Sequence, residues 1–210
     1  DAYTRGIKLR DSRYELGQRL EEITRLQLQL QEQAERDPLT GLHNRRFLDV
    51  ALERELAVCA DSGAPLALVL IDIDRFKRIN DTYGHPAGDE MIRCLADLLR
   101  SRVRDGGLIA CRYGGEEFLL MLPGTHVADA MALAEDLRSH FESLEVVSGG
   151  QVMRTTLSIG VAGCPDHGRQ AQPLVMRADQ ALYEAKLHGR NRVMRASGPS
   201  TVESLLATPA

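Results

Sequence analysis

An uninterrupted aliphatic run from Leu66 to Ile71 constrains the fold of this 210-residue chain more than any other feature. A strand with one face in water alternates apolar and polar residues, whereas this run has no polar position and so indicates a strand buried on both faces. The run ends in Asp72-Ile73-Asp74. Open α/β sheets place their ligands at the exits of such strands. We therefore expect a central strand with a candidate site at its end.

Patterns on either side of this strand predict helices and further strands. Helical periodicity extends over about 44–59, 86–103, 127–144 and 174–185, and short runs that indicate strands lie at 108–111, 118–122, 155–161 and 191–194. That order predicts an α/β fold with a mixed central sheet flanked by helices, of the split β-α-β kind. We assign residues 37–196 to this domain, and residues 197–210, rich in Ser, Pro, Thr and Ala, to a disordered tail.

The first 36 residues differ from the rest, because they contain no Pro and are rich in Arg, Glu, Gln and Leu. Apolar residues recur in heptads at Leu9, Leu16, Ile23 and Leu30, with Leu20 and Ala34 on the companion position and the polar Arg13 and Gln27 interrupting it. This pattern predicts a coiled-coil stalk over 1–36 that joins two chains in a parallel homodimer. The alternative is a lone amphipathic helix packed on its own domain. The stalk should end at Asp37-Pro38, because the residue before proline is disfavoured in a helix.

Composition and charge exclude several classes of function. The formal net charge of −4 does not suit a protein that binds duplex nucleic acid or a membrane surface, and no apolar run approaches the roughly 20 residues of a membrane span. With no secretory signal either, we expect a cytoplasmic protein. Because the chain opens at Asp1 without Met, we expect a fragment that lacks an upstream sensory domain.

The cysteines Cys59, Cys94, Cys111 and Cys164 are widely spaced in apolar contexts and form no C-x-x-C pair. We interpret them as small buried hydrophobic residues in a reducing compartment. His167 follows Cys164 closely, but no companion ligands accompany the two, so the sequence does not predict a zinc site.

Two strands should meet at Arg112-Tyr113-Gly114-Gly115-Glu116-Glu117-Phe118, with a tight turn at the two glycines. This turn carries two adjacent carboxylates, Glu116 and Glu117, which repel each other. Arg112 is the one nearby cation in the sequence, so the pair suggests that a further cation is recruited from outside. The alternative is a solvated turn, since Glu is common at loop tips.

If this hairpin is the spatial neighbour of the central strand, Asp72 and Glu116 face one another across the sheet edge. Mg²⁺ prefers oxygen ligands and usually takes one or two carboxylates together with substrate phosphates. That arrangement suits nucleotidyl transfer, in which the metal stabilises the leaving pyrophosphate and lowers the pKa of the attacking hydroxyl. We assign Asp72 as a ligand and Asp74 as structural, expecting that alternation along the strand turns Asp74 to the opposite face.

Other residues have the chemistry to hold a nucleotide. The glycines would let a phosphate approach the backbone N–H groups closely. Lys77, Lys186 and Arg190 supply cations, the last two at a spacing of four that would share a helix face; the alternative is that this pair only faces solvent. Asn80 and Asp89 could recognise a guanine, since Asp accepts from its N–H groups and Asn donates to its carbonyl. Otherwise Asn80 belongs to a turn and Asp89 to the start of a helix.

Four blocks of sequence occur in a characteristic order. They are Asp37-Pro38-Leu39-Thr40-Gly41-Leu42-His43-Asn44-Arg45-Arg46, Asp72-Ile73-Asp74-Arg75-Phe76-Lys77-Arg78-Ile79-Asn80-Asp81, Arg112 to Phe118, and Ala178 to Lys186 with Gly189-Arg190-Asn191. With these blocks the chain closely resembles the GGDEF family of diguanylate cyclases over about residues 37 to 195, and four ordered blocks are far more specific than any one motif. Glu116 stands where the signature has Asp, a frequent variant that keeps the carboxylate.

The resemblance implies a fold like that of nucleotide cyclases and polymerase palm domains. It also implies condensation of two GTP into cyclic di-GMP with release of two pyrophosphates, each subunit of a dimer presenting one GTP. Asp72, the carbonyl of Ile73 and Glu116 would bind Mg²⁺, with Mn²⁺ as the alternative metal, and Glu116 or Glu117 would help deprotonate the 3′-hydroxyl. The remaining implied contacts are Lys77, Lys186, Arg190 and Gly115 for phosphates, and Asn80, Asp89, His85 and Phe76 for the nucleoside.

One departure from the family pattern concerns product inhibition. Many members carry Arg-x-x-Asp a few residues before the signature, where this chain has Asp105 and Leu108. Arg102-Val103-Arg104-Asp105 has the pattern but lies three residues too early. We therefore predict weak or absent inhibition through that site.

Two other functions compete with a cyclase. One is a non-catalytic receptor for GTP or cyclic di-GMP on the same fold, since a fold does not fix a function. The complete set of catalytic carboxylates argues against it. The other is a different nucleotidyl transferase or nucleotide cyclase, which would not need the guanine-binding pair Asn80 and Asp89.

Overall fold

The structure is a computed structural model that describes residues 2–103 and 107–198. The chain divides into two compact units, Asp1–Arg36 and Asp37–Ala210. The predicted tail lies outside the described residues from position 199 onward, as do Arg104 and Asp105 of the early Arg-x-x-Asp pattern. No helix in the described part of the chain is both long and apolar enough to cross a membrane.

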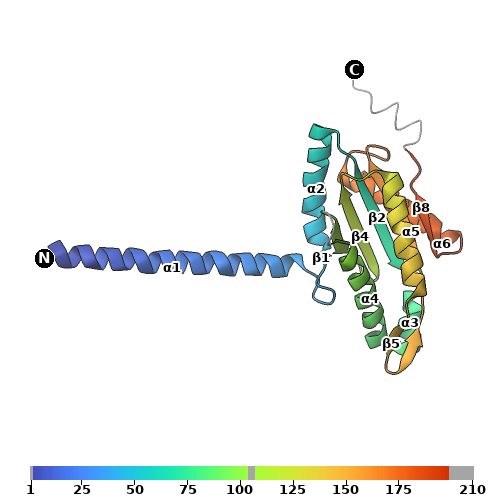
Figure 1. Ribbon diagram of the computed structural model, residues 1–210, viewed down its shortest axis with the longest axis horizontal. Coiled ribbons are helices and arrows are strands. Elements are labelled where there is room, and N and C mark those ends of the chain that lie inside the picture. Colours follow the sequence, from blue (N-terminus) through green and yellow to red (C-terminus); the bar gives the residue numbers. More distant parts are fainter. Residues whose placement is uncertain (1, 104–106, 199–210) are drawn as a thin grey trace, which may run out of the picture. The chain divides into compact units, whose positions relative to one another are not determined.

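The first unit is occupied by the helix α1 (Ala2–Glu35), drawn in blue in Figure 1. The apolar side chains of the predicted seam are exposed in the single chain, with Leu16, Leu20, Ile23 and Leu30 each at least 51% exposed. The side chain of Leu9 lies outside the described residues. An apolar stripe of this kind is what a second helix covers in a coiled coil.

The second unit is built on a mixed sheet, as the sequence predicts. The described residues form six strands in the order β1-β3-β4-β2-β7-β8. β2 pairs antiparallel with β4 and β7, whereas β1 runs parallel to β3 and β8 parallel to β7. The bounds are β1 His43–Asn44, β2 Leu66–Ile73, β3 Ile109–Arg112, β4 Glu117–Pro123, β7 Leu157–Cys164 and β8 Arg192–Arg195.

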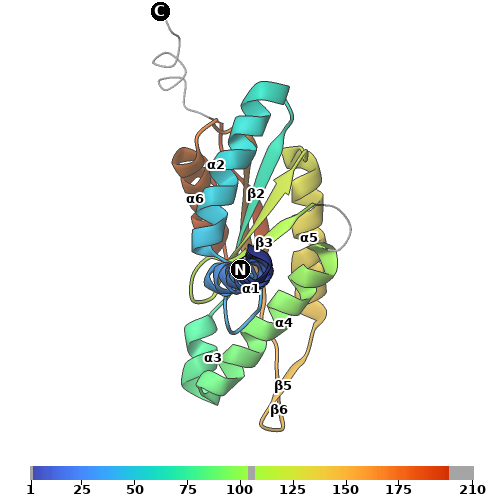
Figure 2. The same ribbon diagram turned by 90° about the vertical axis from the view of Figure 1, so that its left-hand side faces the viewer.

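Helices cover both faces of this sheet, so that β2 is enclosed. Figure 2 shows α2 (Arg45–Ser62) and α6 (Ala171–Leu187) on one side, and α4 (His85–Val103) and α5 (Val127–Ser143) on the other. Alternate residues of β2 enter two separate cores: Ala67, Val69 and Ile71 pack on the α4 and α5 side, and Leu66, Leu68 and Leu70 on the α2 and α6 side. This confirms that the aliphatic run is buried on both faces. The residues that follow the run, from Asp72 onward, therefore lie at the end of a central strand.

Four elements were not expected from the sequence. The strand β1 has two residues, and the hairpin of β5 (Val146–Ser148) and β6 (Gln151–Met153) is nearly as short. The helix α3 (Phe76–Tyr83) is polar, with Ile79 as its buried residue. Such segments bury too little apolar surface to produce a periodic pattern.

The cysteines are free and mostly buried, as expected. Cys59, Cys111 and Cys164 are buried and Cys94 is half-buried. Burial raises the pKa of the Cys111 thiol to about 12, which makes this thiol unreactive near neutral pH.

Candidate active site at the exit of strand β2

Strand pairing brings the predicted carboxylates together at the end of β2. Asp72 is 7% exposed and lies directly opposite Glu117 on β4. The expectation that Asp72 faces Glu116 is therefore wrong by one residue, because β4 begins at Glu117. Glu116 lies one position further out, where its backbone carbonyl accepts from the Ile73 N–H at 3.4 Å. Both glutamates remain close enough to act on Asp72 electrostatically.

At the end of β2, the charged form of the Asp72 carboxyl is disfavoured. The pKa of its carboxyl is raised from 3.8 to about 6: burial is the largest cause, the hydrogen bond and charge of Lys186 act in the opposite direction, and the charges of Glu116 and Glu117 add to the increase. Lys186 Nζ lies 2.7 Å from Asp72 Oδ2. One lysine thus faces three carboxylates, and the site retains excess negative charge that a cation would neutralise.

The donor set fits a divalent metal that is shared with a substrate. The available ligands are carboxylate and carbonyl oxygens, the type that Mg²⁺ prefers. Within the described residues no group of three or more His, Cys, Asp or Glu side chains is placed to hold a metal. Two carboxylates do not form an all-protein cage, but they match the way Mg²⁺ is held together with phosphates.

The hairpin loop is longer than the tight turn expected, because β3 ends at Arg112 and β4 begins at Glu117. The N–H groups of Tyr113 and Gly114 both donate to the Glu117 carbonyl, at 2.8 and 3.1 Å. A Cβ on Gly114 would lie 2.6 Å from Glu117 Oε2, whereas a Cβ on Gly115 would meet nothing within 4 Å. Gly114 is thus needed to seat Glu117, and Gly115 leaves open space beside the carboxylates.

Arg112 holds this loop through contacts that the sequence did not predict. Its Nε and Nη2 donate to the Gly115 carbonyl at 3.1 and 2.7 Å, and its Nη1 lies 3.1 Å from Asp37 Oδ2. Asp37 also accepts from the N–H and hydroxyl of Thr40. Asp37 therefore fixes the signature loop, and its place in the first of the four blocks was the one available signal.

The two residues predicted to recognise guanine lie on neighbouring helices. Asn80 is on α3 and Asp89 on α4, and both are half-buried. A Cβ on Gly88 would lie 2.0 Å from Asn80 Oδ1 and 3.1 Å from the Phe76 ring. Gly88 therefore makes room for the Asn80 amide and for Phe76. His85 is exposed at the start of α4.

The predicted phosphate-binding cations come from different elements. Lys77 is exposed on α3, and Lys186 lies in the last turn of α6. The expectation that Lys186 and Arg190 share a helix face is wrong, because α6 ends at Leu187 and Gly189 follows with a φ of 111°. Arg190 is in the left-handed region with a φ of 65°. A non-glycine residue there costs about 1–2 kcal/mol, which surrounding contacts must offset.

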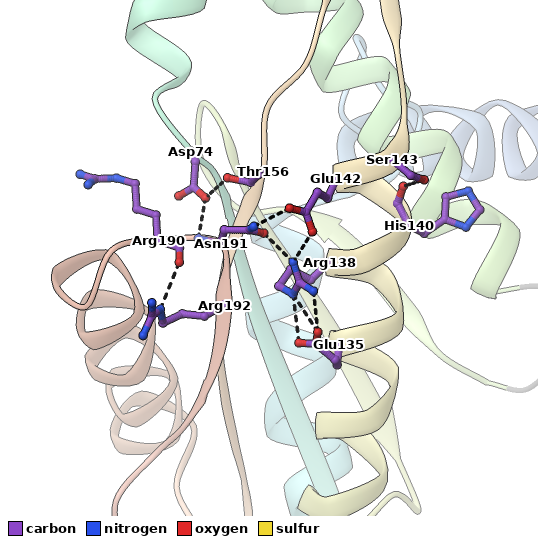
Figure 3. Close-up of polar contacts among 10 residues, drawn as sticks. All are labelled: Asp74, Glu135, Arg138, His140, Glu142, Ser143, Thr156, Arg190, Asn191 and Arg192. Atoms are coloured by element: carbon purple, nitrogen blue, oxygen red, sulfur yellow. Dashed lines mark hydrogen bonds and ion pairs between the residues drawn. The ribbon is translucent and has the colours of Figure 1, made fainter.

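The next residue, Asn191, makes those contacts (Figure 3). The Asn191 N–H donates to Asp74 Oδ2 at 3.0 Å, and its side-chain amide donates to Glu142 Oε1 at 2.8 Å and accepts from Arg138 Nη1 at 2.6 Å. In Figure 3 the Asn191 side chain points toward α5 while that of Arg190 points away from it. No sequence pattern indicated Arg138 and Glu142, because their role depends on contacts with residues far away in the chain.

Arg138 is itself fixed by two carboxylates of its own helix. It lies 2.6 Å from Glu135 and 2.7 Å from Glu142, one turn before and after it. The hydrogen bonds that Arg138 donates to Glu135 raise the pKa of the Arg138 guanidinium, and the bond that it donates to Glu142 lowers the pKa of that carboxyl. The two carboxylates therefore hold the Arg138 guanidinium where its Nη1 donates to the Asn191 side chain.

Asp74 has the structural character that we assigned to it, but for a different reason. Residues two apart on a strand share a face, so alternation does not separate Asp74 from Asp72. Instead β2 ends at Ile73, and Asp74 accepts from Thr156 and Ser158 hydroxyls at 2.6 Å and from the Asn191 N–H. Both of its oxygens are used in joining β2, β7 and the Arg190 loop.

The segment predicted to lack product inhibition is only partly described. Leu108 is half-buried against the core on the α4 and α5 side. Arg102 Nη2 lies 2.6 Å from Asp136 on α5. The weak inhibition expected through this region stays a prediction.

Comparison with known proteins places this geometry in a family. The description "Diguanylate cyclase, GGDEF domain" matches residues 34–192, which is most of the chain. The chain belongs to the GGDEF family. The resemblance noted from the four blocks is thereby confirmed.

Individual GGDEF proteins agree with this assignment. The chain is 44% identical over 160 residues to the response regulator PleD of Caulobacter vibrioides, covering 75% of this chain and 35% of PleD. The coiled coil and GGDEF domain of DgcB from Caulobacter crescentus, in complex with c-di-GMP, matches with a TM-score of 0.78 and 33% identity, over 87% of this chain and 97% of that one. The active GGEEF domain of a diguanylate cyclase from Vibrio cholerae gives 0.68 and 37%, over 73% and 97%. The chain thus spans about a third of the length of PleD.

Proposed function

We propose that this chain is a diguanylate cyclase, which condenses two GTP into cyclic di-GMP and releases two pyrophosphates. One observation above all supports this: Asp72, Glu117 and Lys186 meet at the end of β2, within the segment matched by the family. A receptor would need to bind nucleotide but would not need a strained carboxylate cluster beside the phosphate-binding cations.

Asp72, the Ile73 carbonyl and Glu116 are the residues that would hold the metal, which we propose is Mg²⁺ or, alternatively, Mn²⁺. When bound, such an ion supplies positive charge that lowers the pKa of a nearby hydroxyl and stabilises charge on phosphate oxygens. The protein contributes a buried aspartate whose raised pKa reflects poor hydration, so a cation there replaces missing water contacts.

The reaction joins the 3′-oxygen of each GTP to the α-phosphorus of the other. A new O–P bond forms, the bond from the α-phosphorus to the bridging oxygen breaks, and pyrophosphate leaves. Glu116 or Glu117 accepts the 3′-hydroxyl proton. Lys77, Lys186 and Arg190 neutralise the phosphates, and Gly115 leaves them access to the hairpin backbone.

In this proposal, guanine specificity comes from residues on the neighbouring helices α3 and α4. Asp89 accepts from the guanine N–H groups and Asn80 donates to the carbonyl oxygen, which an adenine could not match. Phe76 and the Asn80 amide both lie next to Gly88, and we assign His85, exposed at the start of α4, to the sugar or base. The seat left by Gly88 supports this assignment, because a side chain there would displace the Asn80 amide.

One domain holds one GTP, so the reaction requires two chains. We propose that residues 1–36 form a parallel coiled coil through the exposed seam, that residues 37–196 form the catalytic domain, and that a sensory segment elsewhere in the whole cytoplasmic protein adjusts the coil. The exposure of Leu16 and Ile23 supports the dimer, since 51–58% exposure of such residues is unfavourable in a monomer.

The deciding experiment is incubation of the full chain with GTP and MgCl₂, with product analysis by liquid chromatography and mass spectrometry. Cyclic di-GMP and pyrophosphate should appear in a 1:2 ratio, and ATP should give no product. If a dimer confirmed by light scattering binds GTP but makes no cyclic di-GMP, the cyclase proposal fails and the receptor takes its place.

A further inference from the structure

An arginine-lined cavity of about 360 Å³ opens beside the Arg190 loop. Its wall includes Arg75 and Arg78 at the start of α3, Arg154 after β6 and Arg190 after α6, so the arginines come from three separate segments of the chain. We refer to it as the arginine pocket. Its volume is near the lower end of the range for ligand sites, about 300–1,000 Å³, so it suits a small ligand.

The arginine pocket carries positive charge that the protein does not neutralise. Asp74 is the one carboxylate of its wall, and both Asp74 oxygens already accept hydrogen bonds. Arg154 is paired with Glu145. Among the described residues, the guanidinium groups of Arg75, Arg78 and Arg190 have no ion pair or hydrogen bond.

Two of these free arginines are held in an unusual backbone conformation. Arg75, Arg190 and Asn191 have φ values of 57°, 65° and 47°, and they are the non-glycine residues with positive φ in the described part of the chain. All three flank the arginine pocket or anchor its wall. Left-handed backbone at non-glycine residues clusters where a function requires it.

The wall is also tied to the end of β2. The Asp74 N–H donates to the Thr156 carbonyl at 2.9 Å, and the Thr155 hydroxyl donates to the Asp74 carbonyl at 2.6 Å. Arg75 directly follows Asp74, so its position is set by the same contacts. The pocket is therefore a fixed extension of the strand exit that carries Asp72.

We propose that the arginine pocket binds inorganic pyrophosphate, the leaving group of the cyclase reaction. Planar guanidinium groups bind phosphate oxygens with paired hydrogen bonds, and three unpaired ones match an anion with several charges better than a singly charged one. Arg190 belongs both to this pocket and to the proposed GTP-phosphate contacts, so the pocket adjoins the place of release. This inference rests on the proposed function, because the cyclase reaction would be the source of the pyrophosphate. The binding of pyrophosphate itself does not depend on that function.

The binding arm of the test uses the full chain without metal. Sodium pyrophosphate is titrated by isothermal calorimetry in EDTA into wild type, Arg78→Gln, the double variant Arg75→Asn/Arg78→Gln and the control Arg46→Gln. Asn tolerates the left-handed conformation of position 75, and Arg46 is another exposed arginine, on α2. We expect one pyrophosphate site per chain. Each pocket substitution should weaken the affinity for pyrophosphate about tenfold, which is the effect of losing one charge-assisted hydrogen bond. Arg46→Gln should leave the affinity unchanged.

The kinetic arm separates free pyrophosphate from the triphosphate end of GTP. With MgCl₂, the double variant should show weaker inhibition of cyclic di-GMP synthesis by pyrophosphate and an unchanged KM for GTP. A KM that rises in parallel with the loss of pyrophosphate binding would assign the arginines to GTP itself and overturn the proposal. So would pyrophosphate binding that all variants retain, or no binding by wild type. Failure of the cyclase proposal is recognised separately, by intact pyrophosphate binding with no cyclic di-GMP formed from GTP.

Discussion

Lys186 and Asp72 form an ion pair 2.7 Å long that joins the last turn of α6 to the end of β2. In the proposed mechanism these two residues serve different partners, Lys186 a phosphate and Asp72 a metal. Their contact in the free protein keeps both side chains ordered at one point before substrate arrives. If the proposed function is correct, the residues of the cyclase site are assembled within each domain, and a single domain lacks only the second GTP.

Replacing Asp72 with Asn should abolish synthesis without harming the fold. We expect cyclic di-GMP formation to fall at least about 100-fold, because a metal's charge stabilisation is worth several kcal/mol. The thermal midpoint should not decrease, since the substitution removes a buried charge and Lys186, with 31% of its side chain exposed, can turn to water. Product chromatography and calorimetry measure the two effects.

The same variant tests the raised pKa of Asp72. A carboxyl whose folded pKa is about 6, above its ordinary 3.8, contributes stability below about pH 4 that is lost as the pH rises through about 6. The difference in unfolding free energy between wild type and Asp72→Asn should therefore change across this window, with wild type losing more stability as pH rises. Urea titrations at several pH values would show it, and a flat difference would contradict the raised pKa.

Alanine at each signature glycine should have a distinct effect. Gly114→Ala places a Cβ against the Glu117 carboxylate, so we expect a lower kcat. Gly115→Ala meets no atom of the protein and should fold normally, but it should raise the KM for GTP about tenfold by obstructing a phosphate. Steady-state kinetics give this split, and wild-type KM in Gly115→Ala would exclude phosphate approach at that position.

Gly88→Ala should weaken guanine recognition. The new Cβ would displace the Asn80 amide, so the KM for GTP should rise at least about tenfold, as for the loss of one hydrogen bond to the base. Asn80→Ser, which keeps Gly88, serves as the matched variant and should have a similar KM. Inhibition by GTP analogues modified on the base distinguishes this from a general loss of binding, which would weaken all nucleotides equally.

Arg138→Gln should loosen the loop that carries Arg190. Removing the guanidinium takes hydrogen bonds from Asn191, Glu135 and Glu142, and should cost about 1–3 kcal/mol of stability. We also expect a higher KM for GTP, with kcat changed less. Arg138→Lys restores the charge without the planar fork, so a full rescue of KM by Lys would show that charge alone positions the loop.

The sequence predicted what depends on local pattern. The aliphatic run led directly to a doubly buried β2 and to Asp72 at its exit, and the adjacent glutamates of the hairpin marked the partner strand. The pairing of Asp72 with Glu117 rather than Glu116 could not be predicted from the sequence. The register of the two strands depends on the loop length, and a shift of one residue changes every pairing partner.

Contacts between distant segments were also not predictable. Arg112 lies 75 positions from Asp37, and Arg138 lies 53 positions from Asn191. Pairs so far apart in the sequence produce no periodic pattern of residues. Arg190 was misplaced on a helix face because a spacing of four says nothing about where the helix ends. These residues hold the loops of the site in place, and loops are specified by tertiary contacts more than by propensity.

The stalk prediction links the exposed seam of α1 to activity. Leu16→Ser/Ile23→Ser removes two apolar residues one heptad apart, and Gln18→Ser/Arg25→Ser makes matched changes at exposed positions off the seam. If the coil supplies the dimer, the seam variant should be monomeric and lose specific activity at low protein concentration. Its activity should recover as concentration rises, because association then follows mass action. Unchanged specific activity in a variant shown to be monomeric would exclude the coiled coil as the element that brings the two GTP sites together.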